Sequence, residues 1–199
     1  MSDWPHRFVR RIFLAIARPM FRLRIEGTEN LPNAGPAILV AHHRSWLDPA
    51  LLGAASARPV HFLILSDVYD KRWTRWFYRW MRTIPVSSDS GKSLFAMREA
   101  IRRLSSGEVI GIFPEGRVFT REEPGEFQPG VGLLARHSGS PVVPVHIRGS
   151  ADAWPKGRTW PRPAPVQVRI GSPIAPGETG QEATEDLIGR IVAALDERS

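Results

Sequence analysis

The amino-acid sequence predicts an α/β fold: a single domain with a mostly parallel or mixed central sheet flanked by helices. Short apolar segments typical of buried strands recur at 36–41, 61–65, 108–113 and 141–147. Segments with helical periodicity lie between them, and strands that alternate with helices form mostly parallel sheets with helices on both faces. Polar motifs also follow two of these strands directly, where α/β sheets bind their ligands.

An amphipathic helix is expected over residues 3–18. Its apolar side chains share one face and its arginines gather on the other. Pro19 is expected to end or kink it. No apolar stretch reaches the roughly 20 residues that a spanning helix needs, so we expect residues 1–21 to lie on a membrane surface as an associating helix. The apolar side chains are Phe8, Val9, Ile12, Phe13 and Ile16, of which Phe8 and Ile12 are the expected lipid contacts.

The next elements follow from local composition. Leu23 and Ile25 alternate with arginines, which favours an edge strand, and a cluster of turn-forming residues occupies 30–35. After the first buried strand, a proline in the first turn favours a helix of small and apolar residues over 48–57.

The second half of the chain continues the alternation of strands and helices, and we see no linker to a second domain within 22–199. Its long polar loop is of a kind that often has a function in compact domains. The expected elements are a helix at 93–104, a strand at 108–113, the loop at 118–129, a helix at 131–137, strands at 141–147 and 165–170, and an amphipathic helix at 182–195.

Residues 71–82 also have two chemically distinct faces, one aromatic and one rich in arginine. An aromatic face of this kind belongs either to the core or to an interfacial helix, and tryptophan favours the headgroup depth of a bilayer. Arginine beside aromatic residues also binds single-stranded nucleic acid, but the chain has no recognisable signature for it, and we expect no nucleic-acid partner. The expected membrane contacts are Trp73, Trp76, Phe77 and Trp80.

Composition restricts the function. The 199 residues carry 27 Lys and Arg against 20 Asp and Glu, a formal net charge of +7, which favours anionic partners such as phosphorylated substrates or anionic lipids. The absence of cysteine excludes a disulfide framework, thiolate catalysis and cysteine-ligated metals.

The most informative motif is His-His-Arg-Ser-Trp-Leu-Asp at 42–48. Imidazole is the side chain best suited to accept a proton near neutral pH, and a nearby carboxylate can fix its tautomer and favour the imidazolium as it forms. We therefore expect His43 to be a general base that deprotonates a substrate hydroxyl and Asp48 to orient it. Ser45 lacks the glycine-flanked turn of a nucleophile and is expected to shape the turn through a local hydrogen bond.

A second motif, Phe-Pro-Glu-Gly-Arg, occupies 113–117. Gly116 allows a ligand to approach the backbone closely, and the planar guanidinium of Arg117 can bind phosphate through two contacts. Glu115 is expected to balance and orient that arginine. The alternative interpretation is an ordinary turn at the end of a strand.

The two adjacent histidines and Asp48 also suggest a metal site. Metal ligands must converge at about 2.0–2.2 Å, whereas adjacent residues of a strand point to opposite faces. We therefore expect no metal, and we expect His42 to face away from His43 and to have a structural role.

These motifs resemble the conserved blocks of the glycerolipid acyltransferases, the lysophosphatidic acid acyltransferase superfamily. Residues 43–48 resemble the first block, in which four residues separate histidine from aspartate (HX4D), 113–117 the third, and Val-Pro-Val at 143–145 the fourth. Their order and spacing match across roughly residues 22–170. The resemblance implies that His43 and Asp48 are catalytic and that Glu115, Gly116 and Arg117 bind the acceptor.

The chain departs from the family's pattern at three points. His42 stands where asparagine is usual. The second block commonly ends in an arginine, whereas residues 82–88 read Arg-Thr-Ile-Pro-Val-Ser-Ser. The third block lacks the common threonine before Arg117, a form that resembles some lysophospholipid acyltransferases acting on larger head groups. The identity of the acceptor therefore stays open.

The resemblance implies an enzyme that transfers a fatty acyl group directly from a thioester to the free hydroxyl of a lysophospholipid, with 1-acylglycerol-3-phosphate as the expected acceptor. Acyl-CoA or acyl carrier protein is the expected co-substrate, without a further cofactor, and backbone amides or Arg44 are the candidate oxyanion donors. The alternatives are another acceptor (glycerol-3-phosphate, a head-grouped lysophospholipid or an acylated amino-acid lipid) and a non-enzymatic lipid-binding protein. We expect residues 22–199 to be the acyltransferase domain of a monotopic protein, bound to phospholipids on the cytoplasmic face of the inner or cell membrane.

Overall fold

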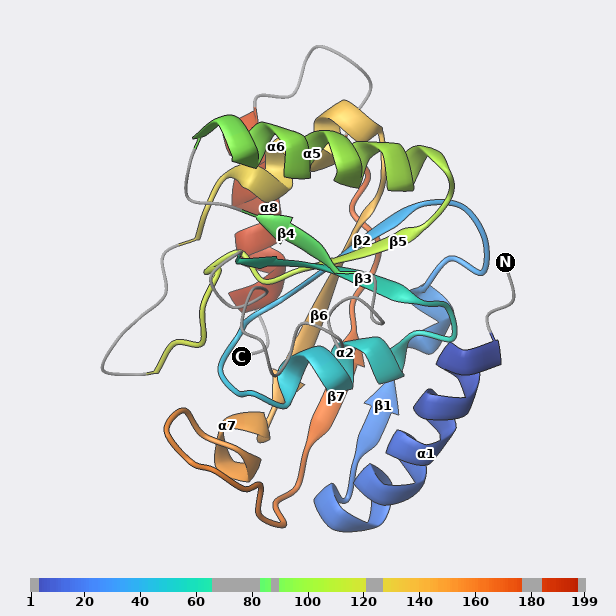
Figure 1. The fold of residues 1–199 in the computed structure, drawn as a ribbon, viewed down its shortest axis with the longest axis vertical. Coiled ribbons are helices and arrows are strands. Elements are labelled where there is room, and N and C mark those ends of the chain that lie inside the picture. The colour runs from blue at the N-terminus through green and yellow to red at the C-terminus, as the bar shows by residue number, and fades with distance from the viewer. Residues whose placement is uncertain (1–3, 66–82, 87–89, 121–126, 177–183, 197–199) are drawn as a thin grey trace.

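The computed structural model describes residues 4–65, 83–86, 90–120, 127–176 and 184–196. Its centre is a seven-stranded sheet in the order β1-β7-β6-β2-β5-β3-β4 (Figure 1). Adjacent strands are parallel except β6 and β7, which are antiparallel, so the predicted mixed sheet is confirmed. The strands are β1 (Arg24–Glu26), β2 (Ala37–Ala41), β3 (Val60–Leu65), β4 (Ile84–Val86), β5 (Val109–Ile112), β6 (Val142–Arg148) and β7 (Gln167–Ile170).

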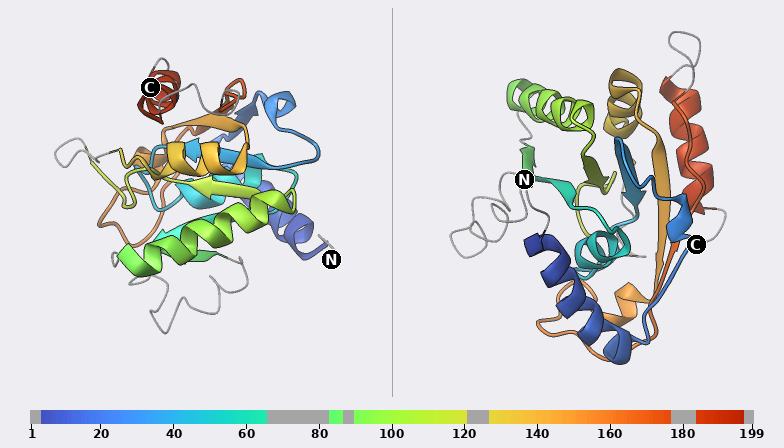
Figure 2. Two further views of the ribbon diagram at one scale, coloured as in Figure 1. Left: turned by 90° about the horizontal axis from the view of Figure 1, so that it is seen from above. Right: turned by 90° about the vertical axis from the view of Figure 1, so that its right-hand side faces the viewer.

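Helices cover both faces of this sheet (Figure 2). α1 and α2 contribute buried side chains to one core cluster, and α5, α6 and α8 contribute to the other. The strand β2 supplies both clusters, because Leu39 points to the first and Val40 to the second. The helices are α1 (Trp4–Phe21), α2 (Asp48–Ala55), α5 (Ser90–Ser105), α6 (Gly130–Ser138), α7 (Ser150–Ala153) and α8 (Thr184–Asp196), with the 3-10 helix η1 (Thr28–Asn30).

Most predicted elements are present, with differences at short segments. Pro19 does not end α1, which continues to Phe21. The reason is tertiary: Phe21 is 3% exposed in the core, and the amide of Leu23 closes the helix on the carbonyl of Arg18 (3.2 Å). The strand β4 and the single-turn helix α7 were not predicted, since three or four residues carry too little periodicity to recognise. The predicted amphipathic segment 71–82 lies outside the described residues.

The helix α1 is apolar on two faces. Leu14, Ala17 and Phe21 pack in the core, whereas a second apolar row points to solvent. In that row Phe8 is 51% and Ile12 is 46% exposed, and the other members are Trp4, Val9 and Ile16. Arg7, Arg11 and Arg18 are exposed beside this row. Arg10 was predicted to lie with them but is partly buried: its Nε donates to the Ala54 carbonyl of α2 (2.9 Å), and burial lowers the pKa of Arg10.

Gly111 in β5 makes room for an aromatic ring. A Cβ at this position would lie 2.6 Å from the ring of Phe62 and 2.8 Å from Val60 Cγ1, distances at which atoms overlap. On the other side of the same ring, a Cβ on Gly53 of α2 would lie 3.9 Å away, in ordinary contact. The absence of a side chain at Gly111 therefore sets where the Phe62 ring lies.

We predict that Gly111→Ala lowers the free energy of unfolding by about 1–3 kcal/mol, because the added methyl group overpacks the core. Gly53→Ala is the matched control, and it should be neutral or stabilising by about 0.5–1 kcal/mol, since glycine is unfavourable within a helix. Chemical denaturation of both variants measures the effect. Equal stabilities for the two variants would contradict the assigned position of the ring.

Candidate active site

The parallel pairing of β2 with β5 brings the two motifs together. Val40 and Ile112 are register partners near the carboxyl ends of the two strands, so the segments that follow, 42–48 and 113–117, begin at the same edge of the sheet (Figure 1). This edge is where open α/β sheets place their ligands.

The predicted pair of His43 and Asp48 is in contact. His43 Nδ1 lies 3.3 Å from Asp48 Oδ2, a long hydrogen bond of the kind that catalytic pairs show before substrate binds. With Nδ1 donating to the carboxylate, Nε2 is the nitrogen that accepts a proton. The side chain of His43 is 13% exposed and that of Asp48 is fully buried, so the imidazole reaches solvent while its carboxylate partner does not.

Asp48 is fixed by the backbone that precedes it. The amides of Arg44 and Ser45 both donate to its Oδ2, each at 2.7 Å. Asp48 is also the first residue of α2, where the helix dipole stabilises a carboxylate. Because these two amides are already bound to Asp48, they are not available to an oxyanion.

The ring of His43 lies on an aromatic stack that the sequence did not indicate. It stacks on Phe113 with ring centroids 4.3 Å apart, and Phe113 is parallel to Phe62 at 5.9 Å. Gly111, two residues before Phe113, provides the space for Phe62. The orientation of His43 therefore depends on a carboxylate at one edge and on packing beneath its face.

Glu115 contacts His42 instead of the predicted partner Arg117. His42 Nδ1 lies 2.5 Å from Glu115 Oε1, and the glutamate side chain is 2% exposed. The expectation that Glu115 balances Arg117 is therefore wrong: the carboxylate points into the protein, whereas Arg117 is exposed. The two adjacent histidines contact different carboxylates, so their side chains diverge, as expected for His42.

The motif at 113–117 folds into a turn that is attached to the histidine segment. The Gly116 amide donates to the Phe113 carbonyl (3.0 Å), and Gly116 has a positive φ of 66°, which favours glycine. Two residues beyond Arg117, the amide of Phe119 donates to the His43 carbonyl (2.9 Å). Gly116 and Arg117 are exposed, and the backbone that carries them is held by these two hydrogen bonds.

Ser45 has two roles in this site. Its Oγ accepts a hydrogen bond from the Leu47 amide (3.1 Å), which is the predicted local bond. It also donates to the Trp154 carbonyl (2.7 Å), a link to the segment after α7 that sequence spacing does not reveal.

The structure describes only some of the predicted membrane-contact residues. Phe8 and Ile12 are exposed on α1, whereas Trp73, Trp76, Phe77 and Trp80 lie outside the described residues. Across the described ranges, no group of three or more His, Cys, Asp or Glu side chains is arranged to hold a metal ion. No helix within those ranges is long and apolar enough to cross a membrane.

An α/β sheet with a buried carboxylate and a histidine at the carboxyl ends of its strands has the arrangement of an enzyme active site. The model of the family described as Acyltransferase matches residues 22–148. The chain therefore belongs to the acyltransferase family, and the resemblance inferred from its motifs is confirmed.

Relatives support this assignment. The chain is 22% identical over 178 residues to a 1-acyl-sn-glycerol-3-phosphate acyltransferase of Bacillus subtilis, with 88% of this chain and 85% of the relative covered. It is 26% identical over 155 residues to a chloroplastic 1-acyl-sn-glycerol-3-phosphate acyltransferase of Arabidopsis thaliana, covering 76% of this chain but only 43% of that longer protein. The crystal structure of the 1-acyl-sn-glycerophosphate acyltransferase PlsC from Thermotoga maritima is similar with a TM-score of 0.78 and 25% identity, covering all of this chain and 82% of PlsC.

We predict that His42 supports the turn at 113–117 through its bond to Glu115. His42→Asn should keep most of the stability and activity, because the asparagine amide nitrogen occupies nearly the position of imidazole Nδ1 and can donate to Glu115. His42→Leu should destabilise the protein by about 1–3 kcal/mol, since a buried carboxylate oxygen loses its donor. Denaturation and steady-state kinetics measure the two effects.

A double variant provides the control for this prediction. His42→Leu combined with Glu115→Met removes both polar partners, and it should be more stable than His42→Leu alone because no buried carboxylate remains unpaired. If the loss of stability in the double variant equals the sum of the losses in His42→Leu and Glu115→Met, the two side chains do not interact and the contact does not hold the turn.

Proposed function

We propose that the chain transfers a fatty acyl group from a thioester to the free hydroxyl of a lysophospholipid, with 1-acylglycerol-3-phosphate as the acceptor. The observation that carries the proposal is the contact of His43 with the buried carboxylate of Asp48, beside an exposed glycine–arginine turn. The acceptor follows from the names of the relatives in Bacillus subtilis and Pseudomonas aeruginosa, the latter 27% identical over 183 residues.

The chemistry follows from the tautomer that Asp48 favours. His43 Nε2 accepts the proton of the acceptor hydroxyl as its oxygen attacks the thioester carbonyl carbon. A carbon–oxygen bond forms, the carbon–sulfur bond breaks, and the proton passes from the imidazolium to the departing thiolate. Asp48 stabilises the imidazolium while it exists. No covalent bond to the protein is needed, because the substrate itself supplies the nucleophile.

The acceptor phosphate is assigned to the turn at 113–117. Arg117 is exposed, and no hydrogen bond or ion pair joins its guanidinium to another residue in the described part of the chain, so its planar donors can face a ligand. Gly116 has no Cβ to obstruct a head group. Glu115 acts indirectly, because its bond to His42 fixes the backbone that presents Arg117.

The protein is proposed to work at a membrane surface. The exposed apolar row of α1 does not pack in the core, and arginines lie beside it, which is the composition of an interfacial helix. We assign this helix to membrane phospholipids on the cytoplasmic face of the inner or cell membrane, where acyl-CoA or acyl carrier protein would deliver the acyl group. The aromatic segment 71–82 is a second proposed contact on sequence grounds.

We predict that His43→Ala lowers acyl transfer by about 10² to 10⁴, the usual contribution of a general base. Asp48→Asn should also reduce transfer strongly, because a neutral amide stabilises the imidazolium poorly. Transfer is measured by mass spectrometry with a panel of lysophospholipids and both donor types. Circular dichroism controls for folding, and a folded His43→Ala protein that retains a tenth of wild-type turnover would exclude His43 as the base.

The phosphate site gives a separate prediction. Arg117→Ala should raise KM for the acceptor far more than KM for the donor, and Arg117→Lys should restore it only in part, since lysine lacks the planar two-point contact. Arg98→Ala, an exposed arginine of α5, is the matched control. An acceptor KM that is unchanged in both Arg117 variants would place the phosphate elsewhere.

A further inference from the structure

The segment after α7 forms a closed turn with an unusual surface. We call residues 154–162 the tryptophan loop. The indole of Trp154 donates to the Arg158 carbonyl (2.9 Å), and the Arg162 amide donates to the Ala153 carbonyl (2.8 Å). A further bond joins Arg162 Nε to the Asp152 carbonyl (2.8 Å). These contacts, together with two prolines within the loop, give it a defined shape although it contains no strand and no helix.

This loop presents one large aromatic side chain among cations. Trp160 is 76% exposed, the highest value among the large apolar residues of the described chain. Lys156, Arg158 and Arg162 are exposed as well, and residues 154–162 contain no acidic side chain. Tryptophan among basic residues is the composition that favours the headgroup layer of an anionic bilayer, where the indole ring is partly buried and the cations meet phosphate.

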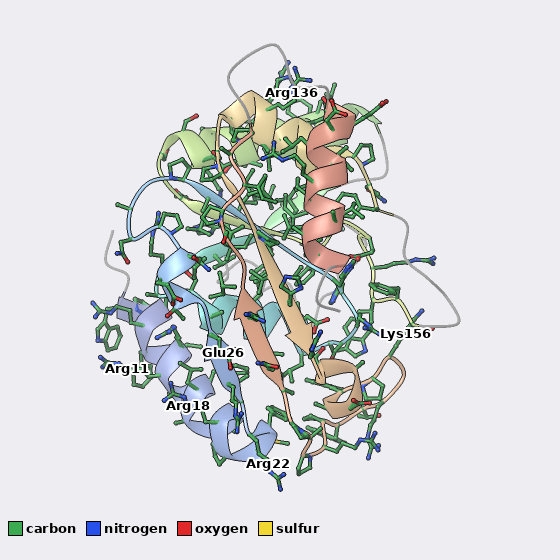
Figure 3. All side chains as sticks on the ribbon, turned by 180° about the vertical axis from the view of Figure 1, so that it is seen from behind. Arg11, Arg18, Arg22, Glu26, Arg136 and Lys156 are labelled. Atoms are coloured by element: carbon green, nitrogen blue, oxygen red, sulfur yellow. The ribbon has the colours of Figure 1, made fainter. Side chains whose placement is uncertain are left out.

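The loop lies at the same end of the molecule as α1. Figure 1 places both the segment after α7 and α1 in the lower half of the molecule, away from α5 and α6. The chain that follows the loop reaches the end of α1, where the Val166 amide donates to the Phe21 carbonyl (2.8 Å). In Figure 3 Arg18 and Arg22 lie at the lower left and Lys156 at the right, below the middle of the molecule, whereas Arg136 lies at the top. The tryptophan loop and the C-terminal end of α1 therefore lie in the same half of the molecule.

The loop is also attached to the active site. Ser45 Oγ, within the histidine motif, donates to the Trp154 carbonyl at the start of the loop (2.7 Å). The backbone amide of Ser45 also donates a hydrogen bond to Asp48 Oδ2 (2.7 Å). A surface bound by the loop is thereby held in a fixed orientation relative to His43 and Asp48.

We propose that the tryptophan loop is a further membrane contact, in which Trp160 enters the headgroup layer of an anionic phospholipid surface and the neighbouring cations bind its phosphates. Together with α1 it orients the active site toward the lipid. This inference rests on the proposed membrane location of the enzyme. An anionic acyl donor is the competing ligand for the same cations. The bilayer is favoured because the loop combines an exposed indole with exposed cations and lies in the same half of the molecule as α1.

Vesicle sedimentation of the full chain, without acyl donor, tests the proposal. Vesicles of phosphatidylcholine alone are compared with vesicles that also contain phosphatidylglycerol, each at low and high salt. Trp160→Ser should lower binding several-fold at both salt concentrations, because burial of the indole is not screened. Arg158→Glu should lower binding by about five-fold or more, only on anionic vesicles and mainly at low salt.

Matched controls lie at the other end of the molecule. Phe95→Ser replaces an aromatic side chain of α5 that is 71% exposed, and Arg136→Glu reverses an exposed charge on α6. Neither should change vesicle binding by more than the experimental error. Thermal unfolding of all four variants verifies that each one is folded.

The outcomes separate this inference from the proposed function. Controls that reduce binding as much as the loop variants would overturn the proposed orientation. Loop variants that bind vesicles normally but raise KM for the acyl donor would assign the loop to the donor and overturn the membrane contact. A wild type that binds no vesicle would overturn every membrane assignment made for this protein, whereas acyl transfer by His43 is judged by its own assay and is unaffected by these results.

Discussion

The parallel pairing of β2 with β5 is the constraint on which the rest of the site depends. It places two motifs, separated by about seventy residues of chain, at one edge of the sheet. Three contacts then join them: the hydrogen-bond contact of His42 with Glu115, the stacking of His43 on Phe113, and the hydrogen bond from the Phe119 amide to the His43 carbonyl. A one-residue shift in this register would turn every strand residue to the opposite face and separate all three pairs.

The sheet and the catalytic pair could be predicted because their signals are local. A parallel strand buried on both faces reads as an uninterrupted apolar run, and each residue of β2 is fully buried, as such a run requires. Asp48 lies five residues after His43, and the turn between them brings its carboxylate to the ring through the amides of Arg44 and Ser45. No distant part of the chain is needed to form that contact.

What the sequence did not reveal depends on contacts between distant residues. Glu115 has an arginine two residues away, yet its partner is His42, because the glutamate points into the protein at the edge that β2 and β5 share. Phe113 and Phe62 support the ring of His43, and this could not be predicted without knowing that β3 lies next to β5. Pro19 shows the same principle for secondary structure, since burial of Phe21 outweighs the local preference of proline to end a helix.

The two apolar faces of α1 affect how this protein can be handled. A helix with an exposed apolar row would ordinarily be a candidate for deletion, to obtain a more tractable fragment for crystallisation. Here the same helix supplies Leu14, Ala17 and Phe21 to the interior, so a fragment that begins at residue 22 would expose the apolar side chains of the core cluster that these residues cover. Such a fragment would aggregate. Polar substitutions in the outward row, with the inward residues left intact, offer a route to a detergent-free sample.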